Sequence, residues 1–289
     1  VEAARPRTLP ASVSPVLLGC ALAYYDGVFD VVPAVLCLLV ALFAQIASNF
    51  ANDYFDFKKG ADREDRLGPE RAVAEGWITP KAMLTGTFVT LGLACAAGLL
   101  LVCFADWRLI GVGIAIAICV LAYSAGPFPL AYNGLGDVCV LLFYGVIPVC
   151  FTYYIQTLNF SLLSFLLSVA LGLLSVNILI VNNYRDYEQD KAVRKRTTIV
   201  LFGRRAGRVF YVLNECMAFL LVLPLILDAP WWILFLFGIL FALCFYTTRE
   251  LFTLEGRALN RTLGHTARNV FLFASVLSLL FLYIGGVSN

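Results

Sequence analysis

Residues 31–48, VVPAVLCLLVALFAQIAS, form a run without one charged side chain. About 20 apolar residues let a helix cross the hydrocarbon core of a bilayer, where only helices and closed barrels satisfy every backbone polar group internally. Of the 289 residues, 61% are hydrophobic and 14% are charged, whereas a soluble domain has roughly 25% charged residues. The chain is therefore predicted to be an all-α integral membrane protein.

Further apolar runs of this kind predict nine transmembrane helices in a single polytopic membrane domain covering residues 1–289. Their expected bounds are 11–28, 31–52, 80–104, 107–125, 134–157, 161–184, 206–228, 230–249 and 266–286. An Asn-x-x-x-Asp pattern recurs four spans apart, at Asn52/Asp56 and Asn182/Asp186. We interpret this as a weak pseudo-repeat of helices one to four and five to eight, followed by a ninth helix.

The positive charges predict how the chain is oriented in the membrane. Of the 21 Lys and Arg residues, all except Arg108 lie before the first predicted span, in the loops two–three, six–seven and eight–nine, or within three residues of the span ends that border those loops. Positively charged loops stay in the cytoplasm. We therefore expect a multi-pass protein of the cell (inner) membrane, with its N-terminus and charged loops cytoplasmic and its C-terminus outside. The partner is the bilayer, and no nucleic-acid partner is expected.

Two acidic segments follow apolar runs at this cytoplasmic side. In residues 49–65, NFANDYFDFKKGADRED, four oxygen-bearing side chains share one face if the second span continues as a helix; they are Asn49, Asn52, Asp53 and Asp56. Gly60 should end that helix, and Asp62 follows. In residues 182–196, NNYRDYEQDKAVRKR, Asn182, Asp186 and Asp190 have the spacing of one helix face.

Stacked carboxylates repel one another, and partial burial increases that cost, so a counter-charge is expected. Mg²⁺ prefers oxygen ligands, uses one or two carboxylates and takes other ligands from substrate phosphates. Two such clusters facing each other could hold a diphosphate through Mg²⁺ ions, with nearby Lys and Arg on the remaining phosphate oxygens. The mixed charges of loop 63–75 are instead typical of a solvated face.

Other classes of site and function are less well matched. The chain contains one His, His265, and no CxxC pair, which argues against a zinc or iron–sulfur site. A transporter is an alternative, because acids within membrane segments often line ion pathways. However, the acids here gather at one membrane face rather than at the midplane where transporters bind substrate.

At these residues the chain resembles the UbiA superfamily of membrane-embedded aromatic prenyltransferases. Its two Asp-rich motifs match NDYFDFKKGAD (52–62) and DYEQD (186–190), although Gly60 stands where the first motif places its last Asp. That variant is similar to the menaquinone branch, the 1,4-dihydroxy-2-naphthoate prenyltransferases. The stretches 4–19, 126–137 and 259–268 favour the same branch.

The resemblance implies a UbiA-like fold of nine transmembrane helices around a central cavity, capped on the cytoplasmic side by loops two–three and six–seven. It implies Mg²⁺-dependent transfer of a polyprenyl group from an allylic polyprenyl diphosphate to 1,4-dihydroxy-2-naphthoate with decarboxylation, giving demethylmenaquinone. Transfer to 4-hydroxybenzoate, homogentisate or haem remains an alternative.

The expected site residues fall into three groups. The predicted metal ligands are Asp53, Asp56, Asp62, Asp186 and Asp190, and all of these except Asp62 are also assigned a catalytic role. The predicted substrate contacts are Asn49, Asn52, Lys58, Lys59, Tyr123, Tyr153, Asn182, Lys191 and Arg196, with Tyr123, Tyr153 and the neighbouring Tyr154 as candidates to line a dry cavity. Arg7 or Lys191 could contact an acidic acceptor, and Asp137 could either position the acceptor or cap a helix.

Overall fold

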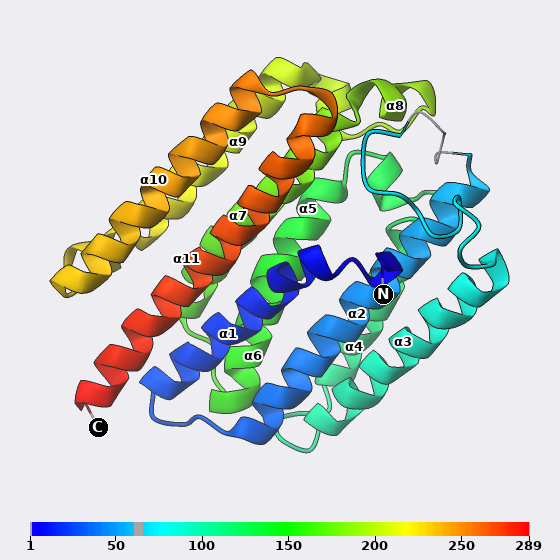
Figure 1. Ribbon diagram of the computed structural model, residues 1–289. Coiled ribbons are helices and arrows are strands. Elements are labelled where there is room, and N and C mark those ends of the chain that lie inside the picture. The colour runs from blue at the N-terminus through cyan, green and yellow to red at the C-terminus, as the bar shows by residue number, and fades with distance from the viewer. Residues whose placement is uncertain (1, 61–65, 289) are drawn as a thin grey trace.

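The structure, a computed structural model, describes residues 2–60 and 66–288, and helices account for nearly all of its regular structure (Figure 1). The long or apolar helices are α1 (Leu9–Tyr25), α2 (Val31–Lys58), α3 (Pro80–Leu101), α4 (Leu109–Ala122), α7 (Leu162–Arg185), α9 (Thr198–Leu227), α10 (Trp231–Thr253) and α11 (Leu259–Ser288). A continuous helical segment between α4 and α7 consists of α5 (Gly136–Leu141), the π-helical turn η4 (Leu142–Val146) and α6 (Ile147–Thr157). The short helices are η1 (Glu2–Ala4), η2 (Pro6–Thr8), η3 (Leu130–Tyr132), α8 (Tyr187–Ala192) and η5 (Gly256–Ala258).

Within the described residues, seven helical segments are long and apolar enough to cross a membrane. They include α2, α3, α7, α9 and α10, the joined segment 136–157 and the segment 256–287 that contains α11. The two other predicted spans correspond to α1 and α4, which are apolar but shorter, at 17 and 14 residues. The chain is thus a multi-pass membrane protein.

Several helices extend beyond the predicted apolar runs into polar sequence. Helix α2 continues to Lys58, α9 begins at Thr198 and α11 begins at Leu259. The Thr197 hydroxyl caps α9 by accepting a hydrogen bond from the Val200 amide at 3.2 Å, and this satisfies a donor that the first turn leaves free. The apolar pattern therefore marks the membrane-spanning part of these helices, and their ends continue into polar sequence.

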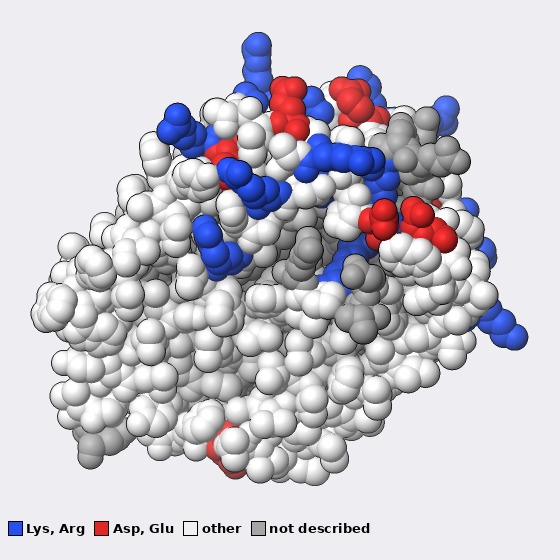
Figure 2. All heavy atoms as spheres, in the orientation of Figure 1, with Lys and Arg blue, Asp and Glu red and all other residues white. Residues whose placement is uncertain are grey.

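Charged side chains gather at one end of the molecule, which we call the charged end (Figure 2). Most of the remaining surface in this view is uncharged, and many large apolar side chains are exposed, among them Leu162 at 73% and Trp231 at 78%. Such a surface is stable against hydrocarbon rather than water. Helix α8 lies at the charged end, and the short N-terminal helices lie in front of α1 and α2 (Figure 1).

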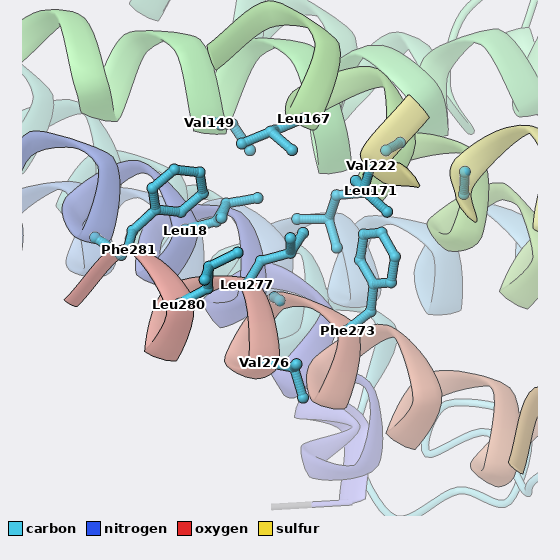
Figure 3. Packing of buried hydrophobic residues seen from close by; sticks show 14 of the residues in the cluster. Leu18, Val149, Leu167, Leu171, Val222, Phe273, Val276, Leu277, Leu280 and Phe281 are labelled. Carbon is cyan, nitrogen blue, oxygen red and sulfur yellow. The ribbon is translucent and has the colours of Figure 1, made fainter. Parts of the chain in front are cut away.

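The largest apolar core fixes the half of the molecule that carries α7. Leu18 of α1, Leu171 of α7, and Phe273 and Leu277 of α11 are fully buried and lie close together (Figure 3). Helix α7 also approaches η4 closely, because a Cβ added at Gly145 would lie 2.5 Å from the Cα atom of Gly172. This packing holds the end of α7, and with it the second acidic segment, in a fixed position.

Candidate active site

A cavity of about 1070 Å³ lies between helices of both halves. Helix α4 packs against α2 and α3, whereas α6 packs against α1 and α7, and all six helices contribute to the cavity wall. Near the charged end the lining is rich in polar residues: Arg5, Asn49, Asn52, Asp56, Arg66, Glu70, Arg71, Tyr132, Asn182, Asn183, Lys195 and Asn260. We call this part the polar mouth. Most of the remaining lining is apolar, and we call that part the apolar arm.

Asp56 in the last turns of α2 is the acidic side chain of the first segment that lines the polar mouth. One carboxylate oxygen accepts a hydrogen bond from the Arg71 guanidinium at 2.8 Å, and the other accepts one from the Tyr132 hydroxyl at 2.8 Å. Asp56 and Arg71 are both buried, at 7% exposure each. A buried carboxylate is stable only when it is paired in this way.

Asp53 lies on the same helix but faces away from the cavity. Its two carboxylate oxygens accept hydrogen bonds from the backbone N–H groups of Ala72 and Val73, at 3.1 and 3.3 Å. This anchors the segment 66–79 against α2 and so places Arg71 beside Asp56. These two bonds use only part of the acceptor capacity of the carboxylate, and Asp53 is not part of the cavity lining. Its metal role stays a prediction.

The second acidic segment begins at a buried ion pair at the end of α7. Arg185 is 1% exposed and donates two hydrogen bonds to Asp186, at 2.7 and 2.6 Å. The same guanidinium also contacts the side-chain oxygens of Asn182 at 2.8 Å and Asn260 at 2.6 Å. Asp186 does not line the cavity, and its pairing with Arg185 orders the polar mouth. Its metal contact stays a prediction.

Asp190 on α8 is placed differently, with one carboxylate oxygen 3.3 Å from the Lys195 ammonium. Its other oxygen, Oδ2, is buried and has no hydrogen-bond partner among the described residues. Burial raises the pKa of Asp190 to about 6, the Lys195 charge opposes this shift, and the negative charges of Asp186 and Asp56 add to it. The two acidic segments therefore lie within electrostatic reach of each other.

Tyr132 links the two acidic segments and was missed by the sequence reasoning, although it lies within the quoted stretch 126–137. Besides bonding Asp56, its ring lies 4.2 Å from the Lys59 ammonium and 5.5 Å from that of Lys195. Its backbone carbonyl accepts a hydrogen bond from the Arg196 amide at 3.0 Å. The phenol thus joins the end of α2 to the loop that follows α8.

Four cations at the polar mouth were also not predicted: Arg5, Arg66, Arg71 and Lys195. Burial, together with the Arg71 and Arg66 charges, lowers the pKa of Arg5 to about 9. Loop 63–75 was interpreted as a solvated face, which is wrong for Arg71. The apolar residues Ala72 and Val73 that follow it, both buried, were the available signal that this part of the loop folds inward.

The predicted substrate contacts divide into those at the cavity and those away from it. Asn49, Asn52, Tyr123 and Asn182 line the cavity. Lys59 donates to the Ser124 carbonyl at 2.6 Å just outside it. Lys58 and Lys191 lie over the rings of Tyr54 and Tyr187, and Arg196 is exposed. None of these three side chains is part of the lining, and their substrate contacts stay predictions.

Tyr153 is likewise not part of the lining, and its hydroxyl donates to Asp26, which follows the last residue of α1 away from the charged end. Its substrate contact also stays a prediction. Tyr154 stacks on Phe160 and is likewise absent from the cavity wall. Tyr123 is thus the one of the three tyrosine candidates that lines the cavity. Asp62 and the side chain of Arg7 lie outside the described residues.

Magnesium fits the polar mouth when a phosphate supplies part of the coordination. Among residues 2–60 and 66–288, no three His, Cys, Asp or Glu side chains are grouped to hold a metal by themselves. Mg²⁺ is usually held by one or two carboxylates together with substrate phosphates and water. Asp56, Asn52 and Asn182 line the polar mouth and provide one carboxylate and two amide groups. Asp190 is not part of the lining, but its ion-pair partner Lys195 is, and its buried Oδ2 atom has no hydrogen-bond partner among the described residues.

Residues 12–277 match the model of the UbiA prenyltransferase family. The chain belongs to that family. Among the relatives of this UbiA chain is the 1,4-dihydroxy-2-naphthoate octaprenyltransferase of Haemophilus influenzae, 38% identical over 218 residues that cover 73% of this chain and 71% of the relative. The enzyme of the same name from Mycobacterium tuberculosis is 37% identical over 234 residues, covering 80% and 79%.

Solved structures show the same UbiA fold. A UbiA homologue from Archaeoglobus fulgidus, bound to GPP and Mg²⁺, aligns with a TM-score of 0.66 at 20% identity and covers 97% of each chain. The apo structure of a UbiA homologue from Aeropyrum pernix K1 aligns with a TM-score of 0.70 at 15% identity, covering 94% of this chain and 97% of the homologue. The predicted UbiA resemblance is therefore confirmed.

Proposed function

We propose that this UbiA chain catalyses Mg²⁺-dependent transfer of a polyprenyl group from a polyprenyl diphosphate to 1,4-dihydroxy-2-naphthoate, with loss of the carboxylate, giving demethylmenaquinone. Relatives named for that acceptor share 37–38% identity over more than two thirds of their own length. The observation that carries the proposal is the single cavity that joins a polar mouth holding Asp56, Arg71 and Lys195 to a long apolar arm. A substrate with an anionic head and a hydrocarbon tail fits this arrangement.

In the proposed mechanism the polar mouth binds the diphosphate. Asp56 and Asp190 would hold Mg²⁺, which when bound neutralises charge building on the diphosphate as it leaves. Arg71, Lys195 and Arg5 would contact the remaining phosphate oxygens, since charge-assisted bonds to phosphate are the strongest polar contacts available. Tyr123 would present a ring face to the allylic cation. The apolar arm excludes water that would otherwise consume that cation.

The finer arrangement of the chain in the membrane is also part of the proposal. We assign the seven long segments together with α1 and α4 as nine transmembrane helices, with helices one to four and five to eight as a pseudo-repeat. The described residues 66–79 and 186–197 would form a cap over the cavity. The gathering of Lys and Arg at the charged end supports a cytoplasmic position for that end in the inner membrane (Figure 2).

The test of the function is transfer by purified protein in detergent or vesicles. Geranylgeranyl diphosphate and Mg²⁺ would be supplied with 1,4-dihydroxy-2-naphthoate, 4-hydroxybenzoate, homogentisate or haem in separate reactions. Release of CO₂ together with a prenylated naphthoquinol supports the proposal. Transfer only to one of the other acceptors would reassign the substrate, and transfer to none would remove the enzyme function.

Removing divalent metal should abolish turnover. EDTA is expected to reduce transfer to background, and Mg²⁺ added in excess of EDTA should restore it, because Asp56 and Asp190 bind the diphosphate only through a bridging cation. Restoration by Mg²⁺ but not by Na⁺ at equal ionic strength separates the metal role from charge screening. Undiminished turnover in EDTA would contradict the metal-dependent mechanism.

The apolar arm should accommodate the prenyl tail. It is lined by small residues on facing helices, including Gly98 on α3 and Gly113 on α4. Leu99, Ile110 and Ile114 also line it and are 58%, 41% and 55% exposed. Wall residues with so much exposed surface indicate that the arm reaches the lipid-facing surface, where a long tail can continue into the bilayer.

Gly113→Trp should therefore select against long tails. Ten residues of chain, or ~15 Å along a helix, separate Gly113 from Tyr123, so a geranyl tail ends near this position and longer tails must pass it. We expect the rate with geranylgeranyl diphosphate to fall about tenfold or more relative to geranyl diphosphate, because the indole ring would occupy space that a longer tail must pass, and steric overlap of this kind costs about 1–3 kcal/mol.

Gly111→Trp is the matched control for this prediction. Gly111 lies on the same helix, does not line the cavity and has no atom within 4 Å of an added Cβ, as is also true of Gly113. The control should keep the wild-type preference for tail length. Equal tail-length profiles for the two tryptophan variants would show that the arm does not hold the tail.

A further inference from the structure

Asp137 is an acidic side chain of the cavity wall that the mechanism above does not use. It lies in the first turn of α5. A Cβ atom added at the neighbouring Gly136 would lie 3.6 Å from the Tyr123 hydroxyl. Tyr123 and Asp137 therefore line the same part of the cavity. This places Asp137 next to the proposed position of the allylic cation.

In the described part of the chain Asp137 forms no ion pair, in contrast to three acids of the two acidic segments. Asp56, Asp186 and Asp190 each form a salt bridge with Arg71, Arg185 or Lys195, whereas among the described residues no Lys or Arg forms one with Asp137. The side chain of Thr198, another cavity residue, is within hydrogen-bonding reach of the carboxyl group. The oxygen Oδ1 is buried and has no partner in the part of the chain that the structure describes.

Helix capping does not explain this residue. The N-cap position of α5 is Leu135, and no side-chain hydrogen bond caps the helix. A buried acceptor without a partner costs about as much as a lost hydrogen bond and is rare unless a ligand or water completes it. Acidic side chains inside membrane proteins are costly and usually functional. Asp137 therefore has the properties of a ligand contact.

We infer that Asp137 binds a ring hydroxyl group of the aromatic acceptor and so sets which ring carbon faces the allylic carbon. The inference rests on the proposed prenyl transfer and assigns the hydroxyl-recognising residue for it. A carboxylate that has no paired cation can accept a hydrogen bond from a hydroxyl group. Thr198 would hold one oxygen of the carboxyl group, leaving Oδ1 to receive the acceptor, and the absence of a paired cation disfavours the diphosphate at this position.

The test compares Asp137→Asn with wild type using the acceptor and two analogues, 1-hydroxy-2-naphthoate and 4-hydroxy-2-naphthoate, each lacking one hydroxyl. Wild type should bind the analogue without the recognised hydroxyl about 10- to 100-fold more weakly than the full acceptor, the range expected for a hydrogen bond to a charged group. Asp137→Asn should bind the full acceptor as weakly as wild type binds the analogue without the recognised hydroxyl. The variant should therefore bind the full acceptor and that analogue with equal affinity. Equilibrium binding by calorimetry and the KM for each acceptor are both measured.

Two further measurements separate this role from a merely structural one. The KM for geranylgeranyl diphosphate and the Mg²⁺ dependence should stay within about twofold of wild type, and Asp137→Glu should recover part of the acceptor affinity. Asp228→Asn, an exposed acid between α9 and α10, is the matched control and should change nothing. A variant that discriminates between the analogues as wild type does, or loses diphosphate binding equally, would overturn the inference.

The outcome is also distinct from a failure of the proposed function. If wild-type protein transfers prenyl groups to no hydroxynaphthoate, the proposed function fails. If wild type transfers and Asp137→Asn behaves as wild type toward all three acceptors, only the role of Asp137 fails.

Discussion

Asp56→Asn is expected to lower turnover by about 10³-fold or more at saturating substrates. The change removes one negative charge from the polar mouth while keeping the volume of the side chain and one oxygen, which can accept from Tyr132. The amide nitrogen replaces the oxygen that accepts from Arg71 and cannot accept that bond. Loss of a single preorganised electrostatic contact to a transition state typically costs 10²–10³-fold, and here the bridging cation is lost as well. Steady-state transfer to the naphthoate, measured with the amount of protein normalised, gives the value.

The loss of turnover reports on catalysis only if the Asp56→Asn variant is still folded. The variant should elute as wild type in size-exclusion chromatography, since Asn maintains the contact with Tyr132 on the neighbouring loop. Asp228→Asn serves as the matched acid-to-amide control and should keep full activity, because Asp228 is exposed and does not line the cavity. Activity of Asp56→Asn within a few-fold of wild type would exclude Asp56 as a metal ligand.

Arg185→Met should have the largest effect on stability. Arg185 is 1% exposed and bonds Asp186, Asn182 and Asn260, so methionine leaves a buried carboxylate without its counter-charge. Breaking one side of a buried ion pair costs about 3–5 kcal/mol, and the lost bonds to two amides add to this. Thermal unfolding in detergent, followed by tryptophan fluorescence or by loss of monodisperse protein, should show a markedly lower midpoint.

The control and the second variant identify the cause. Arg205→Met, an exposed position in α9, should leave the midpoint nearly unchanged. Adding Asp186→Asn to Arg185→Met should recover part of the lost stability, because the orphaned charge is then removed. A double variant as unstable as Arg185→Met alone would indicate that lost packing around the guanidinium, rather than the unpaired carboxylate, is responsible.

The sequence predicts helices and their polar ends well, but not which way each polar side chain turns. Charge placement predicted that both acidic segments lie at one end, and the structure agrees. Asp53 and Asp56 are three residues apart, hence ~60° apart around a helix, and both fall on what sequence spacing treats as one face. In the structure that small angle separates a residue bonded to the backbone at 72–73 from one that lines the cavity.

The residues that sequence reasoning missed act through contacts between distant segments. Tyr132 reaches Asp56 across 76 positions, and Arg185 reaches Asn260 across 75. Periodicity describes a single element, so it carries no information on such pairs. Arg71 illustrates a second limit, because a charged loop was predicted to be solvated, whereas the backbone bonds made by Asp53 fold its inner half against α2.

The pairing of Arg71 with Asp56 and of Lys195 with Asp190 determines the order in which the site is expected to fill. A Mg²⁺ ion without diphosphate must compete with Arg71 and Lys195 for the two carboxylates, and it supplies no new anionic partner for these displaced cations. A diphosphate that arrives with its metal supplies anionic oxygens to which Arg71 and Lys195 can transfer. The resting enzyme should consequently remain unloaded at cytosolic magnesium concentrations, and metal and prenyl donor should bind together rather than in sequence.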